Sequence, residues 1–230
     1  MADGRRPKLT AIELGADHAS WAGAGFTVVD SCARVGGVAI EFTPSVHGVA
    51  SLSFDWLPEG FGSLDGIALG IRPAVAPDSH SNGVVSLDQV VIATPQFERT
   101  AAALEGLGLA IRREAVRKAD DDIGTDVRQG FVRAGGPVLE LVHTEAVPPG
   151  PAHVWGLGFI TESFDEALED LDGVIGKPRP AVQPGRRIAT FVRDSGLGLP
   201  VVLLDPEPTP DEVGDPPGSV GRGAPHASGD

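Results

Sequence analysis

Residues 87–109 read LDQVVIATPQFERTAAALEGLGL, and this stretch decides the fold. The run Val84–Ala93 is rich in Val, Ile and Leu, which predicts a strand packed on at least one face. Pro95 ends that strand because proline has no amide hydrogen to give to a ladder. Apolar residues then follow at spacings of four and three, the pattern of one helical stripe. These residues are Phe97, Ala101, Leu104 and Leu107.

Three further strands are expected after this helix. Gly106 and Gly108 end the helix, since glycine tolerates the left-handed conformation that a helix end needs. The segments that read as strands are Leu109–Glu114, Val127–Ala134 and Val138–His143. The unit is therefore one strand, one helix and three strands.

The same unit occurs a second time along the chain. Phe97 returns as Phe164, and in each copy a leucine follows seven residues later. Residues 131–133, Phe-Val-Arg, return unchanged as residues 191–193. Because the matches keep their order, we interpret the two stretches as an internal duplication.

Two shorter copies are expected in the first third of the chain. Residues 34–41 align with residues 133–140 without a gap, matching at Arg, Gly, Gly and Glu. A fourth copy over residues 45–75 would have lost its helix, and a plain β-meander is the alternative interpretation. The predicted organisation is a flexible leader 1–8, degenerate modules 9–75, a linker 76–83, a paired domain 84–206 and a disordered tail 207–230.

Tandem units that open on LDQVVIATPQF resemble the vicinal oxygen chelate superfamily, which includes glyoxalase I, bleomycin-resistance proteins and extradiol dioxygenases. The resemblance covers residues 84–206. It implies an α+β fold in which tandem βαβββ modules form curved mixed sheets around a cup, with the helices outside. Such a fold hosts several chemistries and also proteins that only bind, so the reaction does not follow from it.

The resemblance also implies where a metal would be held. In the superfamily, ligands come from the first and last strands of each module, which here points to Gln89 and Glu140 as catalytic and metal-binding residues. The matching positions of the second module are Gly156 and Leu203, which offer no ligand atom. Catalytic metal sites usually keep three protein ligands. A divalent Ni, Zn, Mn or Fe ion is therefore less favoured than a site without metal.

Glu140 needs a partner in either case, because an unpaired buried carboxylate is costly. A metal is one such partner and an arginine is the other. The candidate arginines are Arg128, Arg133 and Arg187.

Five residues outside the metal positions are candidates for ligand binding. The turn Gln183-Pro-Gly-Arg186-Arg187 enters a strand, and two guanidinium groups there would clamp an anionic ligand through paired hydrogen bonds. The alternative is a solvated turn whose arginines pair with surface acids. Trp155 would stack on a flat ligand or pack in the core, and His153 would act as a base or lie exposed.

Composition limits the partners. The net charge of −14 and the pI near 4.7 argue against nucleic acid and anionic membranes, because phosphate binding needs clustered Lys and Arg. A single cysteine, Cys32, forms no internal disulfide, and no apolar run is long enough to span a bilayer. We expect a cytoplasmic protein that is a monomer or a homodimer.

Three functions remain open from the sequence. The favoured one is a glyoxalase-like protein that binds a small, anionic molecule in the cup and has an incomplete metal site. The first alternative is a divalent-metal-dependent lyase, isomerase or dioxygenase. The second is a structural or partner-binding protein whose cup is filled by its own side chains.

Overall fold

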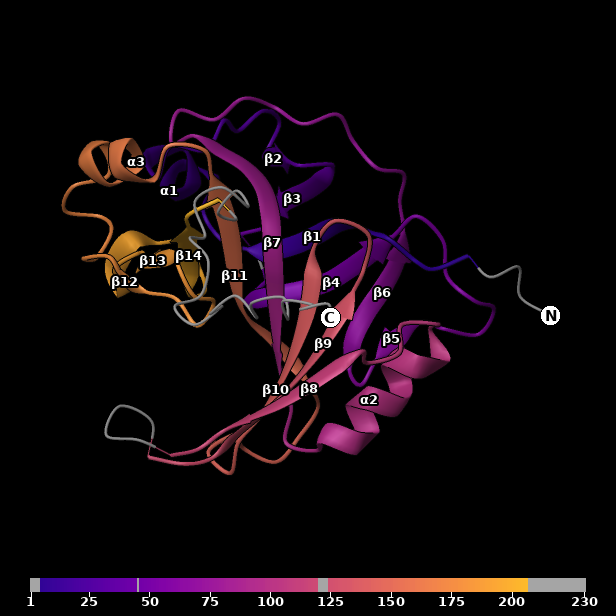
Figure 1. The fold of residues 1–230 in the computed structure, drawn as a ribbon. Helices are drawn as coiled ribbons and strands as arrows, with labels where there is room; N and C mark the ends of the chain where they lie inside the picture. The colour runs from indigo at the N-terminus through magenta and orange to yellow at the C-terminus, as the bar shows by residue number, and fades with distance from the viewer. Residues whose placement is uncertain (1–4, 45, 120–123, 207–230) are drawn as a thin grey trace, which may run out of the picture.

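A computed structural model describes residues 5–44, 46–119 and 124–206, so the predicted tail 207–230 and the first four leader residues lie outside the described part. The described chain forms two mixed sheets that do not close into barrels (Figure 1). Sheet A has the order β2-β3-β1-β4-β6-β5, with bounds β1 Leu9–Gly15, β2 Cys32–Val35, β3 Val38–Phe42, β4 Gly48–Phe54, β5 Ser63–Leu64 and β6 Ile67–Ile71. The expected α+β class with mixed sheets is confirmed.

Sheet B is the larger of the two. Its order is β12-β13-β14-β11-β7-β10-β9-β8, with bounds β7 Val84–Ala93, β8 Arg113–Arg117, β9 Val127–Arg133, β10 Val138–His143, β11 His153–Thr161, β12 Arg179–Pro180, β13 Arg187–Thr190 and β14 Val201–Leu204. The helices are α1 His18–Gly23, α2 Phe97–Gly106 and α3 Phe164–Asp170, with a 3-10 turn at Arg193–Ser195. None of the described helices is long and apolar enough to cross a membrane.

One strand arrangement occurs four times. In sheet B, β7 lies parallel beside β10 and β11 lies parallel beside β14, while β7 and β11 meet antiparallel. In sheet A, β1 lies parallel beside β3 and β4 beside β6, while β1 and β4 meet antiparallel. The unit β4-β5-β6 has a turn at residues 58–62 where a helix would stand. That the four units arose by duplication stays a prediction.

The strand after α2 begins later than expected. Gly108 adopts a φ of 82°, and Leu109 behind it is only 1% exposed, packed in the core. Pairing with β9 starts at Arg113, which faces Phe131. The predicted strand Leu109–Glu114 is therefore wrong in its first four residues, because burying Leu109 takes those residues away from the sheet edge.

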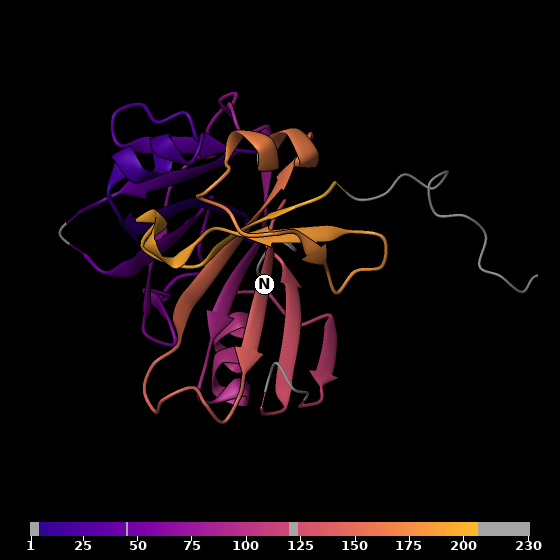
Figure 2. The same cartoon turned by 90° about the vertical axis from the view of Figure 1, so that its left-hand side faces the viewer.

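The core lies between the two sheets, which appear as separate layers in Figure 2. Trp21 of α1 is fully buried, and its ring lies 6.0 Å from Phe159 of sheet B and 5.1 Å from Phe42 of sheet A. Its indole N–H donates to the carbonyl oxygen of Leu197 at 3.2 Å. One side chain thus joins both sheets.

The predicted linker 76–83 is fixed to sheet A by a buried histidine. His80 is 8% exposed; its Nδ1 accepts from the amide of Thr27 at 3.0 Å, and its Nε2 lies 3.2 Å from the carbonyl oxygen of Arg34. These partners assign the proton to Nε2 in the neutral ring. Burial lowers the pKa of His80, so the neutral form is favoured.

Candidate functional site

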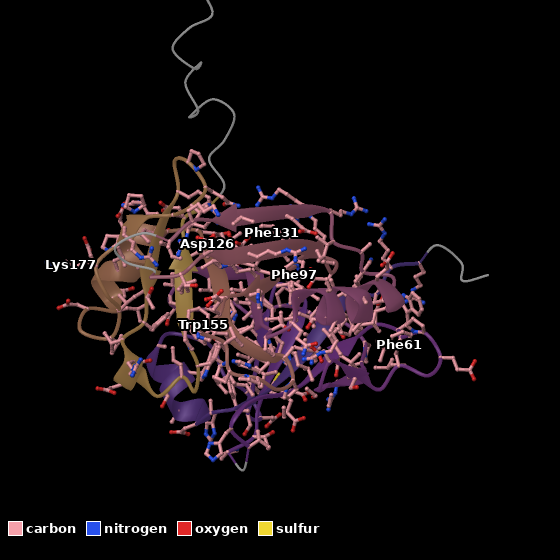
Figure 3. All side chains as sticks on the ribbon, turned by 90° about the horizontal axis from the view of Figure 1, so that it is seen from below. Phe61, Phe97, Asp126, Phe131, Trp155 and Lys177 are labelled. Atoms are coloured by element: carbon pink, nitrogen blue, oxygen red, sulfur yellow. The ribbon has the colours of Figure 1, made fainter. Side chains whose placement is uncertain are left out.

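The two faces of sheet B differ in character. Phe97 of α2 packs against the face that carries Gly130, whereas Phe131 points to the opposite face because side chains alternate along a strand. In Figure 3, Phe131 accordingly lies farther from sheet A than Phe97 does. Register places the following residues with Phe131, and we call them the polar face of sheet B: Gln89, Arg113, Arg117, Gln129, Phe131 and Glu140.

Glu140 is the buried acid of this face. It is 8% exposed and accepts a hydrogen bond from the side-chain amide of Gln129. Burial raises its pKa, while the Gln129 hydrogen bond and the nearby Arg113 and Arg117 oppose the rise and Asp88 adds to it. The carboxyl group is therefore shifted toward its neutral form.

The side chain that donates a hydrogen bond to Glu140 is a glutamine and not one of the candidate arginines. Arg128 lies on the opposite face, with its guanidinium carbon 3.8 Å from the Phe97 ring centroid and a hydrogen bond to Glu114 at 3.0 Å. Arg187 is bound elsewhere, and Gln129 takes the place of the predicted arginine. Glu140 pairs with Phe131 and Arg128 pairs with His143, so the side chains of Arg128 and Glu140 point to opposite faces of the sheet.

Gln89 shares the face with Glu140 but leans away from it. A Cβ placed on Gly158 would lie 2.8 Å from Gln89 Cγ and 3.2 Å from Leu204 Cδ1. The Gln89 side chain therefore covers β11, on the opposite side of β7 from the strand that carries Glu140. The two predicted ligands are on one face and diverge.

In the second module, the last strand, β14, carries apolar side chains on the polar face. Leu203 is fully buried and pairs with Phe159, so it faces the core, and its neighbours Val202 and Leu204 take the polar-face positions of β14. Across the β7–β11 pair, Gln89 lies opposite Gly158. That Gly156 and Leu203 are the second module's counterparts of Gln89 and Glu140 stays a prediction.

The turn at residues 183–187, which the sequence predicted to bind an anion, makes its contacts with other parts of this chain. Arg187 Nε donates to Asp205 at 2.8 Å and Nη1 donates to Asp165 at 2.7 Å. Its guanidinium carbon lies 4.8 Å from the ring centroid of Phe164 on α3, so this arginine points to the helix face. These contacts fit the alternative of a turn whose arginines pair with acids, and a role for Arg187 in ligand binding stays a prediction.

Arg186 points the other way and is 3% exposed. Its Nε and Nη2 donate to the carbonyl oxygen of Asp205 at 2.9 and 2.7 Å, and Nη1 donates to Gln183. Nη1 also lies 3.9 Å from Asp88. Gln183 and Arg186 thus close the β12–β13 turn onto the strand ends, and their predicted role in clamping an anionic ligand stays a prediction.

Trp155 lies at a β-bulge in β11. Val154 before it pairs with the buried Ile92, and Gly156 after it pairs with Val91, so Trp155 turns to the polar face. Its side chain is 54% exposed. His153 lies exposed at the strand start, opposite Ala93. Trp155 is therefore available for stacking at one end of the polar face.

Sequence reasoning missed four residues of this face. The guanidinium carbon of Arg113 lies 4.3 Å from the Phe131 ring centroid, which is a cation–π contact. Arg117 and Gln129 complete the set around Glu140. The signal was present as period-two alternation in Arg113–Arg117 and Val127–Arg133, which assigns these residues to one face once the register is known.

Solved structures give a match where sequences do not. No protein-family model and no curated protein sequence matches the chain. A triple mutant of 4-hydroxymandelate synthase from Streptomyces coelicolor superposes with a TM-score of 0.56 at 15% identity, covering 87% of this chain and 93% of that chain. This match shows a shared fold, which is consistent with the fold that the sequence resemblance implies. Methylmalonyl-CoA epimerase from Mycobacterium tuberculosis matches at a TM-score of 0.45 and 18% identity, over 55% of this chain and 91% of its own.

The resemblance to the vicinal oxygen chelate superfamily implies a divalent metal, and the residues present do not fit one. Gln129 already bonds Glu140, Gln89 leans over Gly158, and β14 presents only Val202 and Leu204. Within residues 5–44, 46–119 and 124–206, no three His, Cys, Asp or Glu side chains are grouped to hold a metal ion. The chemistry available on this face is hydrogen bonding, charge pairing and stacking.

Proposed function

We propose that the polar face of sheet B binds a small organic anion and that the binding needs no metal. The observation that carries this proposal is the state of Arg113 and Arg117. In the part of the chain that the structure describes, neither arginine forms an ion pair within 4.0 Å of a carboxylate oxygen, and the acid that they act on electrostatically is Glu140, although the protein carries a net charge of −14. Both point to the face that holds Glu140.

A guanidinium group that no internal acid satisfies is a ready donor for a ligand carboxylate. Its planar N–H groups match the two oxygens of a carboxylate in a bidentate pair. Arg113 is also preoriented, because its guanidinium carbon stacks 4.3 Å from the Phe131 ring centroid. Less side-chain freedom is then lost on binding than with a fully mobile arginine.

Aromatic groups support a flat ligand. Phe131 lies beside the arginine, and Trp155, with 54% of its surface exposed, lies farther along the same face. A large exposed tryptophan is a common anchor for ring stacking at binding sites. These features favour an aromatic or otherwise planar carboxylate.

Glu140 would act as a hydrogen-bond donor in this site. Burial raises its pKa and shifts the group toward the neutral carboxyl, which donates through its O–H. A bound anion would push the same pKa further upward, since a like charge nearby disfavours ionisation. Ligand binding should therefore be coupled to proton uptake by Glu140.

The test is calorimetric titration of chelator-treated protein with a panel of small aromatic carboxylates. Arg113→Gln should weaken binding about tenfold, the loss of about 1.4 kcal/mol expected for one charged hydrogen-bonding group. The control is Arg193→Gln, which alters an exposed arginine outside the polar face. Equal losses in the two variants would contradict the proposal, because they would indicate only general electrostatic attraction.

Metal analysis separates the proposal from the enzyme alternative. A divalent-metal-dependent lyase, isomerase or dioxygenase requires near-stoichiometric Ni, Zn, Mn or Fe in protein purified without chelator. If such a metal were present and were lost in Glu140→Ala, the metal-free proposal would be overturned. The proposal predicts binding of equal strength before and after chelation.

A further inference from the structure

A second cluster of arginines lies away from Glu140, at the end of sheet B where β9 meets the leader. A cleft of about 180 Å³ opens there, lined by Arg6, Arg112 and Arg133. The other lining residues are the loop 108–110 and Val132, and no described carboxylate borders the cleft. The cleft is therefore positively charged in a protein whose net charge is −14.

These arginines differ from most others in the chain. Seven arginines are each within 4.0 Å of an Asp or Glu oxygen: Arg5, Arg34, Arg72, Arg99, Arg128, Arg186 and Arg187. Among the residues that the structure describes, Arg6, Arg112 and Arg133 have no such partner. With carboxylates in excess over the whole chain, three unneutralised guanidinium groups at one cleft indicate a site for an external anion.

Hydrogen bonds and packing hold the backbone around the cleft, and the positions of the three arginines on that backbone are therefore fixed. The amide of Leu9 donates to the carbonyl oxygen of Ala134 at 2.9 Å, which fixes the leader beside the end of β9. Pro7 is buried next to Gly108. The amide of Arg112 donates to the carbonyl oxygen of Phe131 at 3.0 Å. That residues 1–8 form a flexible leader stays a prediction.

We propose that this cleft binds a phosphate group. A phosphate dianion offers three terminal oxygens, and three guanidinium groups supply paired donors to each of them. One guanidinium alone satisfies a carboxylate, so a carboxylate ligand would leave two arginines without a partner. The volume is several times the roughly 30 Å³ that a water molecule occupies, which leaves room for a phosphate group.

Arg133 shares the sheet face of Phe131 by register, but the inference stands apart from the proposed function because neither Glu140 nor Arg113 lines this cleft. The test is calorimetric titration of the full chain with inorganic phosphate at low salt, repeated on Arg112→Gln and Arg133→Gln. Each variant should weaken binding about tenfold. Arg179→Gln is the matched control, since Arg179 is exposed on β12 and outside the cleft, and its affinity should match the wild type.

Three results would overturn the proposal: no saturable binding at millimolar phosphate, equal weakening in Arg179→Gln, or acetate binding as tightly as phosphate. Because the arginines are exposed, the variants should keep the wild-type unfolding midpoint, and ¹⁵N spectra should show phosphate-dependent shifts at the amides of residues 108–112. A second titration with phenyl phosphate identifies the source. Tighter binding of the ester than of inorganic phosphate supports a phosphorylated small molecule, and the reverse order supports free phosphate.

Discussion

Replacing Glu140 by glutamine should make the protein more stable at neutral pH. Glu140 is 8% exposed, and burial raises its pKa above the ordinary value of 4.5. For an acid whose pKa is raised in the folded state, the contribution of its neutral form to folding stability is fully present below the unfolded pKa. That contribution is lost as pH rises through the folded pKa. At pH 7 the ionised carboxylate is therefore a net cost, which the isosteric, neutral side chain of Glu140→Gln removes.

The expected gain follows from the surroundings of the carboxylate. Gln129 supplies one hydrogen bond, and Arg113 and Arg117 offset part of the desolvation, so the remaining cost is about 1 kcal/mol at pH 7. For a chain of this size that corresponds to a rise of about 3 °C in Tm. The amide of Gln129 keeps an oxygen acceptor in the variant, so no buried donor is left unpaired.

The assay is urea unfolding of Glu140→Gln and wild type across a pH series, followed by tryptophan fluorescence. The difference between them should shrink as pH falls through the raised folded pKa toward 4.5, and it should change no further below 4.5, where both the folded and the unfolded chain are protonated. Glu59→Gln, at an exposed loop position, should show no such trend. A variant that is less stable than wild type at pH 7 would refute the reasoning, because it would mean that the folded state stabilises the ionised form.

Three further predictions concern stability and the limits of the site. Because burial lowers the pKa of His80, the contribution of the neutral ring to folding stability is present above pH 6.5 and is lost as pH falls toward the pKa of the folded state. His80→Gln should flatten that part of the curve of stability against pH, measured by urea unfolding. Trp21→Ala should cost about 4 kcal/mol in the same assay, since it empties a fully buried ring site between the sheets, and a loss below about 1 kcal/mol would contradict the described packing. Arg187→Ala should cost only about 1 kcal/mol, because its side chain is 43% exposed, and should leave carboxylate affinity unchanged in calorimetry; a fall in affinity would return Arg187 to the ligand site.

Sequence periodicity was enough to predict the units of the fold. The apolar run before Pro95 and the helical stripe from Phe97 are local patterns, and they reappear in the structure as β7 and α2. The resemblance to the vicinal oxygen chelate superfamily rested on these units and on the stretch LDQVVIATPQF that opens them. What local patterns could not give was the start of β8, which depends on Leu109 reaching the core.

The site was harder to predict because bulges decide which side chains share a face. Register shifts around Trp155 and between Gly158 and Phe159 mean that residue offsets counted along the chain do not match positions across the sheet. The contacts of Arg187 with Asp165 and Asp205 could not be predicted, because both partners are distant in sequence. Such pairings leave no local pattern.

The central claim is that the polar face of sheet B binds a small organic anion without metal. The most direct measurement is chemical-shift mapping on the ¹⁵N-labelled, chelator-treated full chain during titration with an aromatic carboxylate. The account predicts saturable shifts at the side-chain amide of Gln129, the backbone amides of Phe131 and Glu140, and the indole N–H of Trp155. Shifts confined to other surfaces, or shifts at these groups only after a divalent metal is added, would contradict it.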